Sequence, residues 1–126
     1  MEATAITDAL DVITNTLETA GLGTIYNHVP AKPVYPCVII TPMPEFITDG
    51  DVYTQRLINL MVWVLVAPTP DNKKLQLNLY EQIPKALDAL ESLGALQFDN
   101  VGQPVPVEYN QVKTLAAIIE VNYLIN

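Results

Sequence analysis

Residues 112–125 read VKTLAAIIEVNYLI, and this stretch decides the fold because two sets of residues alternate along it. The two interleaved sets are Leu115, Ala117, Ile119, Val121, Tyr123 and Ile125, and Thr114, Ala116, Ile118, Glu120, Asn122 and Leu124. Successive side chains of a β-strand point to opposite faces of the sheet, so alternation of this kind is typical of a strand. The pattern predicts a final strand over 112–125.

A second long strand is predicted over 52–67. Its first half alternates polar and apolar residues, whereas 60–66 (LMVWVLV) is apolar on both faces. Such a strand is expected to start exposed and to run into a layer that is covered on both sides. The span is long for a strand, so its leading end is expected to project beyond the body of the domain.

Two amphipathic helices accompany these strands. The first apolar stripe has helical spacing and consists of Ile6, Leu10, Ile13 and Leu17. Thr4 is the expected N-cap of this helix, and the Gly21-Leu22-Gly23 stretch is its expected end. The second stripe consists of Leu75, Leu79, Ile83, Leu87 and Leu90, with Gly94 as the stop. Pro84 falls inside this second pattern and predicts a kink or a split near 80–84.

The remaining segments are shorter or irregular. A short strand is predicted over 24–29, and the prolines that follow it exclude both a helix and a central strand. A buried strand is predicted over 37–41, stopped by Pro42 and Pro44. The segment 43–51 is predicted to be a loop or hairpin tip, with Asp49-Gly50 as its turn signal. Residues 95–109 are predicted to be irregular, with short extended pieces.

Two helices can cover only one face of a sheet. The sequence therefore predicts an α+β fold in two layers, with a mainly antiparallel sheet of four to five strands, two helices on one face and a projecting hairpin. The chain of 126 residues is expected to form one domain, residues 1–126, because no linker, repeat or low-complexity tract divides it.

Composition and charge restrict the function further. Fourteen acidic residues against six basic ones give a formal net charge of −8, with a single arginine among the bases. A protein that grips nucleic acid needs lysine and arginine to neutralise phosphate, so specific DNA or RNA binding is not expected. Half of the residues are apolar, and the mean hydropathy of +0.24 favours buried contacts between subunits. The longest apolar run is too short to span a bilayer, and the N-terminus lacks the basic start of a signal peptide.

Reactive side chains are scarce. His28 is the only histidine, and no motif supplies it with a nucleophile and an orienting acid. Cys37 opens an apolar strand, where a buried structural thiol is expected, and a single cysteine excludes an intrachain disulfide. Glu45, Asp49 and Asp51 surround Gly50 without the spacing of a calcium loop. We therefore expect no enzyme activity, no catalytic residues, no metal site and no cofactor.

An interaction surface is the remaining kind of site. The segment 43–51 carries large apolar side chains among acids, and such side chains in an exposed loop can anchor a partner. Folding of this loop back onto its own sheet is the alternative. The large apolar side chains in question are Met43, Phe46 and Ile47.

The order of elements resembles a known family. An N-terminal helix is followed by TIYNHVPAKPVYPCVIITP, the long strand VYTQRLINLMVWVLVAP, the helix LQLNLYEQIPKALDALESLG and the final strand TLAAIIEVNYLIN. In this order, and in length, the chain resembles the tail-terminator (tail-completion, tail-to-head joining) proteins of long-tailed bacteriophages. The resemblance covers nearly the whole chain and rests on element order and not on a catalytic motif.

The resemblance implies a structural protein of the virion. It implies a homo-oligomeric, hexameric ring that caps the tail tube, stops its polymerisation and contacts both the tail tube protein and a head-completion or neck protein. Assembly in the host cytoplasm and a final location in the tail or neck follow from the same resemblance. By position, 43–51 and the leading end of the long strand, 52–56, match the projecting hairpin with which such proteins contact the tube. The resemblance therefore implies these contact residues, for the tube or a neighbouring subunit: Met43, Glu45, Phe46, Ile47, Asp49, Asp51, Tyr53 and Arg56. DNA would pass through the ring without specific binding, and an acidic wall suits that passage because it repels phosphate.

Two other functions are open from the sequence. One is a small-ligand-binding or regulatory α+β module acting as a dimer, which predicts a closed pocket and a ligand that raises thermal stability. The other is an enzyme that uses the acids near Asp49 and Asp51 with a bound metal.

Overall fold

Strands β3 (Arg56–Leu65) and β6 (Val112–Ile125) form the centre of the sheet in the computed structural model, which describes residues 3–50, 55–109 and 111–125. They pair antiparallel without interruption from Arg56 opposite Ile125 to Leu65 opposite Ala116. The predicted final strand over 112–125 is confirmed at both ends. The other elements are α1 (Ala5–Glu18), β1 (Thr24–Tyr26), β2 (Cys37–Asp49), α2 (Asn72–Glu91), β4 (Leu96–Val101) and β5 (Val105–Tyr109).

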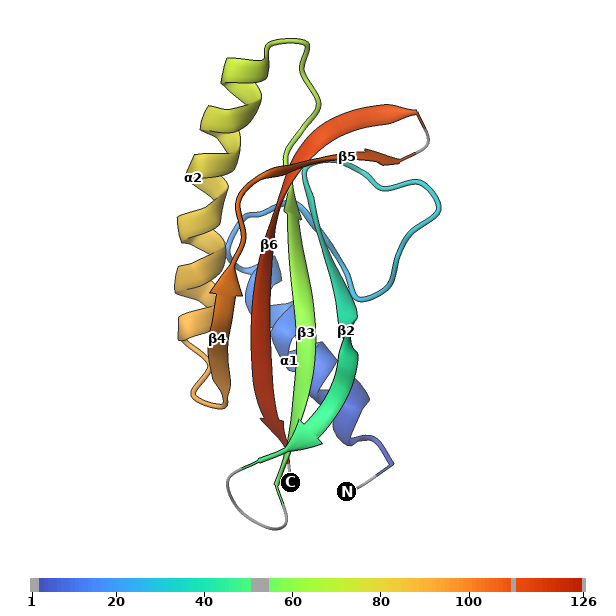
Figure 1. Ribbon diagram of the computed structural model, residues 1–126, viewed down its shortest axis with the longest axis vertical. Helices are drawn as coiled ribbons and strands as arrows, with labels where there is room; N and C mark the ends of the chain where they lie inside the picture. The colour runs from blue at the N-terminus through green and yellow to red at the C-terminus, as the bar shows by residue number, and fades with distance from the viewer. Residues whose placement is uncertain (1–2, 51–54, 110, 126) are drawn as a thin grey trace.

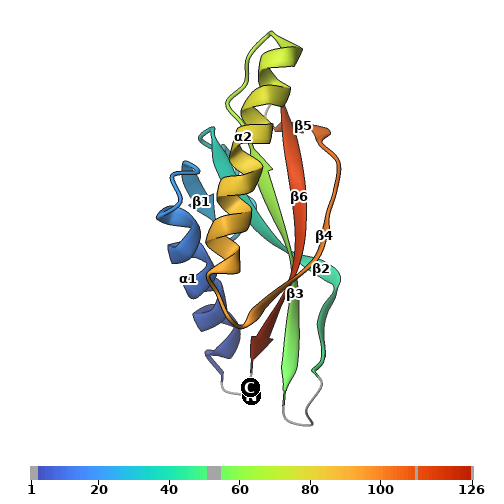
Figure 2. The ribbon, with the colours of Figure 1, turned by 90° about the vertical axis from the view of Figure 1, so that its left-hand side faces the viewer.

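The described residues form a six-stranded sheet in the order β1-β2-β3-β6-β4, with β5 also paired to β6. Only the β1–β2 pair is parallel, and the four other pairs are antiparallel. Both helices lie on the same face of the sheet, as Figures 1 and 2 show. The predicted two-layer α+β class is therefore confirmed, with more strands than the expected four to five.

The core lies between the helices and this face of the sheet. The helices contribute Ala9, Ile13 and Leu17 from α1 and Leu75, Leu79, Ala86 and Leu90 from α2. Ile58, Leu60, Val62 and Val64 from β3 and Ala117, Ile119 and Val121 from β6 complete it, all buried. Burial of these aliphatic side chains stabilises the domain because each fully buried one contributes about 1.5–3 kcal/mol.

The opposite face of the sheet carries a smaller apolar cluster at one end. Cys37, Ile39, Leu65 and Ala116 are buried there, and Trp63, Tyr35 and Val107 are among the residues packed against them. The predicted cover on both sides of the second half of 52–67 is thus confirmed at Leu65, whereas Met61 and Trp63 on this face are half-buried. β3 itself ends at Leu65, and the expected strand over 24–29 is shorter, ending at Tyr26.

The helix ends differ in part from the expectation. Thr4 occupies the N-cap of α1 but its side chain makes no capping hydrogen bond, and its carbonyl accepts from the backbone N–H of Asp8 at 2.8 Å. Gly21 has the positive φ of 75° expected after the helix. Asp71 caps α2, since its carboxylate accepts from the N–H groups of Lys73 at 3.0 Å and Lys74 at 3.4 Å.

Of the predicted kink or split near 80–84, the split is wrong, because α2 is continuous through Pro84. Proline removes the hydrogen bond to the carbonyl four residues earlier, which belongs to Tyr80. Pro84 is exposed and the side chain of Tyr80 is 52% exposed. On this outer side of the helix water can bond the carbonyl of Tyr80, so the helix tolerates the proline.

The prediction for 95–109 is right about short extended pieces but wrong in making the segment as a whole irregular. The segment forms β4 and β5, which lie along β6 one after the other. β4 pairs with the C-terminal half of β6, from Leu96 opposite Tyr123 to Val101 opposite Ile119, and β5 pairs with 112–116. Gly102 and Pro104 separate the two strands, and β6 is long enough to hold both. No helix of the described residues is long and apolar enough to cross a membrane.

Candidate functional site

The outer edge of β2 carries most of the predicted contact residues. The prediction of a loop over 43–51, after a strand stopped at Pro42, is wrong because β2 runs from Cys37 to Asp49 through both prolines. β1 pairs only with Cys37–Ile39, so the rest of β2 lies at the edge of the described sheet. A proline is tolerated on an edge strand because its missing N–H can face away from the ladder.

A buried amide holds β2 in place beyond the prolines. The pairing of β2 with β3 shifts register between Pro42 and Ile47, so several backbone groups leave the regular ladder. Asn59, 8% exposed, donates a hydrogen bond of 2.8 Å to the carbonyl of Glu45 and one of 3.1 Å to Oγ1 of Thr48. These bonds replace the missing ladder contacts and fix the far half of β2.

Three exposed side chains on this half of β2 form what we call the β2 patch: Glu45, Ile47 and Asp49. Ile47 is 39% exposed, which is high for a large aliphatic residue on a strand. The carboxylate of Asp49 lies 3.7 Å from Nε of Arg56, at the start of β3. Both side chains of that pair are substantially exposed, so the pair adds little to stability.

The other predicted contact residues are placed differently. Met43 is half-buried, and Phe46 is half-buried and packs against the main core. The alternative in which this segment folds back on its own sheet therefore holds for Phe46. Arg56 pairs with Ile125, so β3 lies within the sheet from its first residue. Asp51 and Tyr53 fall outside the described residues, as does the start of the strand expected at 52.

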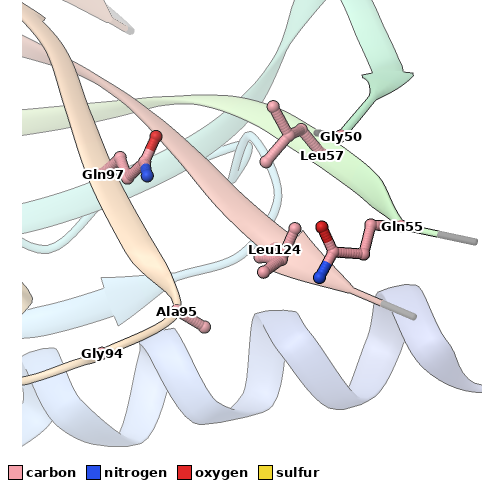
Figure 3. A pocket seen from close by; sticks show the side chains of 7 residues that line it. All are labelled: Gly50, Gln55, Leu57, Gly94, Ala95, Gln97 and Leu124. Atoms are coloured by element: carbon pink, nitrogen blue, oxygen red, sulfur yellow. The ribbon is translucent and has the colours of Figure 1, made fainter. Parts of the chain in front are cut away.

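A small hollow lies beside the base of the β2–β3 hairpin (Figure 3). The backbone N–H of Gly50 donates to the carbonyl of Gln55 at 3.1 Å. Figure 3 shows Gln55 and Gln97 on either side of an apolar floor made by Leu57 and Leu124. The hollow has a volume of about 120 Å³, with Gly50, Gly94 and Ala95 completing its lining. Ligand sites for small molecules measure about 300–1,000 Å³, so this hollow is too small to enclose one.

A second exposed apolar surface lies on the outer side of α2, at the N-terminal end of the helix. Leu77 and Tyr80 are each 52% exposed and stand three residues apart, so they share one side of the helix. Lys73 lies one turn before Leu77, and Lys74 lies beside it; both are exposed. We call these four residues the α2 patch.

Sequence reasoning missed the α2 patch. The predicted stripe of this helix includes Leu75 and Leu79 and is buried there, as expected. A second apolar pair off that stripe, with helical spacing, was the signal that would have found it. Gln97 and Leu124, in the hollow beside the hairpin, gave no signal because nothing in the sequence indicates that β4 and β6 pair.

The reactive side chains that the structure describes lie apart from one another. His28 is exposed, and its Nδ1 lies 3.3 Å from Oδ1 of the adjacent Asn27. Cys37 is buried, as predicted, and burial raises the pKa of its thiol from 9.0 to about 11. Within the described part of the chain, no three His, Cys, Asp or Glu side chains lie where they could hold a metal ion.

Two open hollows lie on the helical side. One, of about 380 Å³, is bordered by α1 and α2, and Lys85 and Asp88 are among its lining residues. The other, of about 210 Å³, lies between α1 and the end of β6, where it is lined mainly by small and apolar residues such as Ala9, Val12 and Tyr123. Neither is the closed pocket that a dimeric ligand-binding module predicts.

The chain matches no protein-family model, and no curated protein matches its sequence.

Proposed function

We propose that this protein is a structural subunit of a bacteriophage virion. In this proposal its copies associate head to tail into a ring, hexameric by the resemblance, that caps the tail tube. The ring ends tail polymerisation and joins the tail to the head or neck. The resemblance in element order supports the assignment, and the arrangement of the exposed surfaces supports the mode of assembly.

The observation that carries the proposal is that the two flanks of the sheet present different surfaces. One flank ends in the edge of β2 with its exposed Glu45, Ile47 and Asp49; the other ends in β4, with α2 beside it (Figure 1). A symmetric dimer uses one surface twice, whereas a ring of identical subunits needs two different surfaces that fit each other. The unlike flanks thus offer the two different surfaces that a ring needs.

The charge of the chain agrees with a conduit for DNA. Each subunit carries a formal net charge of −8, so a ring concentrates negative charge around its opening. Phosphate is repelled by such a wall and DNA slides through without being held. In this proposal the protein makes no specific contact with bases.

Two further partners follow from the proposal: the tail tube protein and a head-completion or neck protein. The end of the molecule that holds the β2–β3 hairpin is our candidate for contact with the tube. There Gln55 and Gln97 flank Leu57 and Leu124, and side-chain amides both donate and accept hydrogen bonds. An extended segment of a tube subunit can bond to these amides at the mouth of the hollow.

Binding to tail tubes tests this function. Purified protein is mixed with polymerised tubes of the tail tube protein from the same phage, and the pellet is imaged by electron microscopy. Density at one end of each tube, and a halt in further growth when tube monomers are added, are the expected results. Tubes that remain bare and continue to grow at both ends would contradict the proposal.

A further inference from the structure

We propose that the ring is closed by contact between the α2 patch of one copy and the β2 patch of the next. This inference rests on the proposed ring and specifies which residues build its interface. The two patches lie at opposite ends of the molecule: Figure 1 shows the start of α2 at the top and the end of β2 at the bottom. A contact between two different surfaces repeats from copy to copy, and in this proposal the rotation between neighbouring copies closes the chain of contacts into a ring.

The two patches match in charge. Lys73 and Lys74 lie in the first turn of α2, where the helix dipole adds positive character. Asp71 reduces this charge but does not cancel it, because its carboxylate is bonded to the N–H groups of the same turn. The β2 patch offers Glu45 and Asp49, of which only Asp49 has a described cationic partner, the exposed Arg56.

They also match in apolar content. Leu77 and Tyr80 together present a large apolar area next to the lysines, and Ile47 stands between the two acids of the β2 patch. Aromatic and aliphatic side chains inside a rim of opposite charges are the usual composition of a specific protein interface. A second copy of this chain supplies both halves of such an interface, so no other partner needs to be assumed.

The acids of the β2 patch stand where they do because of Asn59. Its hydrogen bond to the carbonyl of Glu45 fixes the backbone of the irregular part of β2, and its bond to Thr48 fixes the residue before Asp49. The backbone that carries the patch is therefore held in place before association, which lowers the entropic cost of binding.

Charge reversal tests the interface. One variant carries Lys73→Glu and Lys74→Glu, and the other carries Glu45→Lys and Asp49→Lys. Neither pair is expected to unfold the domain: acids are favourable in the first turn of a helix, and lysine is common on edge strands. Each variant alone is expected to associate at least about tenfold more weakly than the wild type, because like charges then face each other.

Mixing the two variants decides the question. In an alternating ring every contact again pairs opposite charges, so an equimolar mixture is expected to regain the mass of the wild-type oligomer. The control for net charge carries Lys32→Glu and Lys85→Glu, two exposed lysines outside both patches, and has the same −12 as the α2-patch variant. It is expected to associate like the wild type in sedimentation velocity at low salt.

Three results would overturn the inference: oligomers that survive both reversals, a mixture that stays dissociated, or a wild type that remains monomeric at low salt. Results that refute this interface differ from results that refute the proposed function. Wild-type rings that are unaffected by either reversal leave the ring in place and refute only this interface. Failure to bind and cap tail tubes refutes the function, whatever interface the copies use.

Discussion

The side-chain amide of Asn59 on β3 donates a hydrogen bond of 2.8 Å to the backbone carbonyl of Glu45 on β2. The bond joins the buried centre of the sheet to the exposed patch at its edge. It also explains how β2 continues for 13 residues although two prolines interrupt its ladder. One buried polar side chain thus connects the stability of the sheet with the surface that we assign to association.

Replacing Asn59 with alanine is expected to lower the free energy of unfolding by about 1–3 kcal/mol, because the buried groups that it bonds lose their partner. Urea denaturation measures this loss. The matched control is Asn122, a half-buried residue on β6 that lies opposite Asn59. Replacing Asn122 with alanine should lower the free energy of unfolding by less than about 1 kcal/mol. An equal decrease in the free energy of unfolding at the two positions would show that the hydrogen bond to Glu45 does not stabilise the sheet.

The glycines after α1 offer a second matched pair. Both have positive φ, 75° at Gly21 and 96° at Gly23, but a Cβ at Gly21 would meet open space while one at Gly23 would collide with the carbonyl oxygen of Pro36. Gly21→Ala is expected to cost about 1–2 kcal/mol, from the backbone conformation alone. Gly23→Ala adds the collision and should cost about 3 kcal/mol or more. Thermal unfolding measures both, and equal melting temperatures would contradict the account.

Pro84→Ala is expected to stabilise the protein by about 1–3 kcal/mol, since the hydrogen bond to the carbonyl of Tyr80 is restored within a helix that is already continuous. The exposed neighbour serves as control: Lys85→Ala should change stability by no more than about 0.5 kcal/mol. A destabilised Pro84→Ala variant in urea denaturation would mean that the proline has a structural role that its exposure does not reveal.

Burial of Cys37 predicts a dependence of stability on pH. Its pKa is raised by burial to about 11, so between pH 9 and 11 the unfolded chain loses the thiol proton while the folded chain keeps it. The contribution of this group is fully present below pH 9 and is lost as the pH rises through the folded pKa. The stability difference between wild type and Cys37→Ala should therefore shrink from pH 8 to pH 11. A difference that stays constant over this range would contradict a buried, protonated thiol.

The sequence predicted correctly those strands and helices whose own residues show a regular pattern of apolar and polar positions. The strand over 112–125 and the helical stripe of Leu75 and Leu79 were predicted for that reason. Sequence-based prediction failed where a strand forms only because it pairs with another strand. The segment 95–109 has little alternation of its own, and it forms β4 and β5 because β6 pairs with it. The predicted stop of the strand at Pro42 was wrong for a related reason. Whether a proline ends a strand depends on whether that strand lies at the edge of the sheet.

The candidate site shows the same division. Glu45, Ile47 and Asp49 were predicted to be exposed and are, although they lie on a strand and not in a loop. Phe46, in the same segment, packs against the core. The α2 patch was missed because its apolar pair, Leu77 and Tyr80, gives a weaker signal than the longer buried stripe of the same helix. Only the fold shows that this patch and the β2 patch lie at opposite ends of the molecule.

The most direct test of head-to-tail assembly is the mass of the purified protein, measured by multi-angle light scattering at low salt, with electron microscopy of the same sample. The account predicts rings with a central opening and a mass several times that of the 13.9 kDa chain, a hexamer by the resemblance. A stable, compact dimer with two-fold symmetry would contradict it, because a symmetric contact cannot use both flanks of the sheet to close a ring.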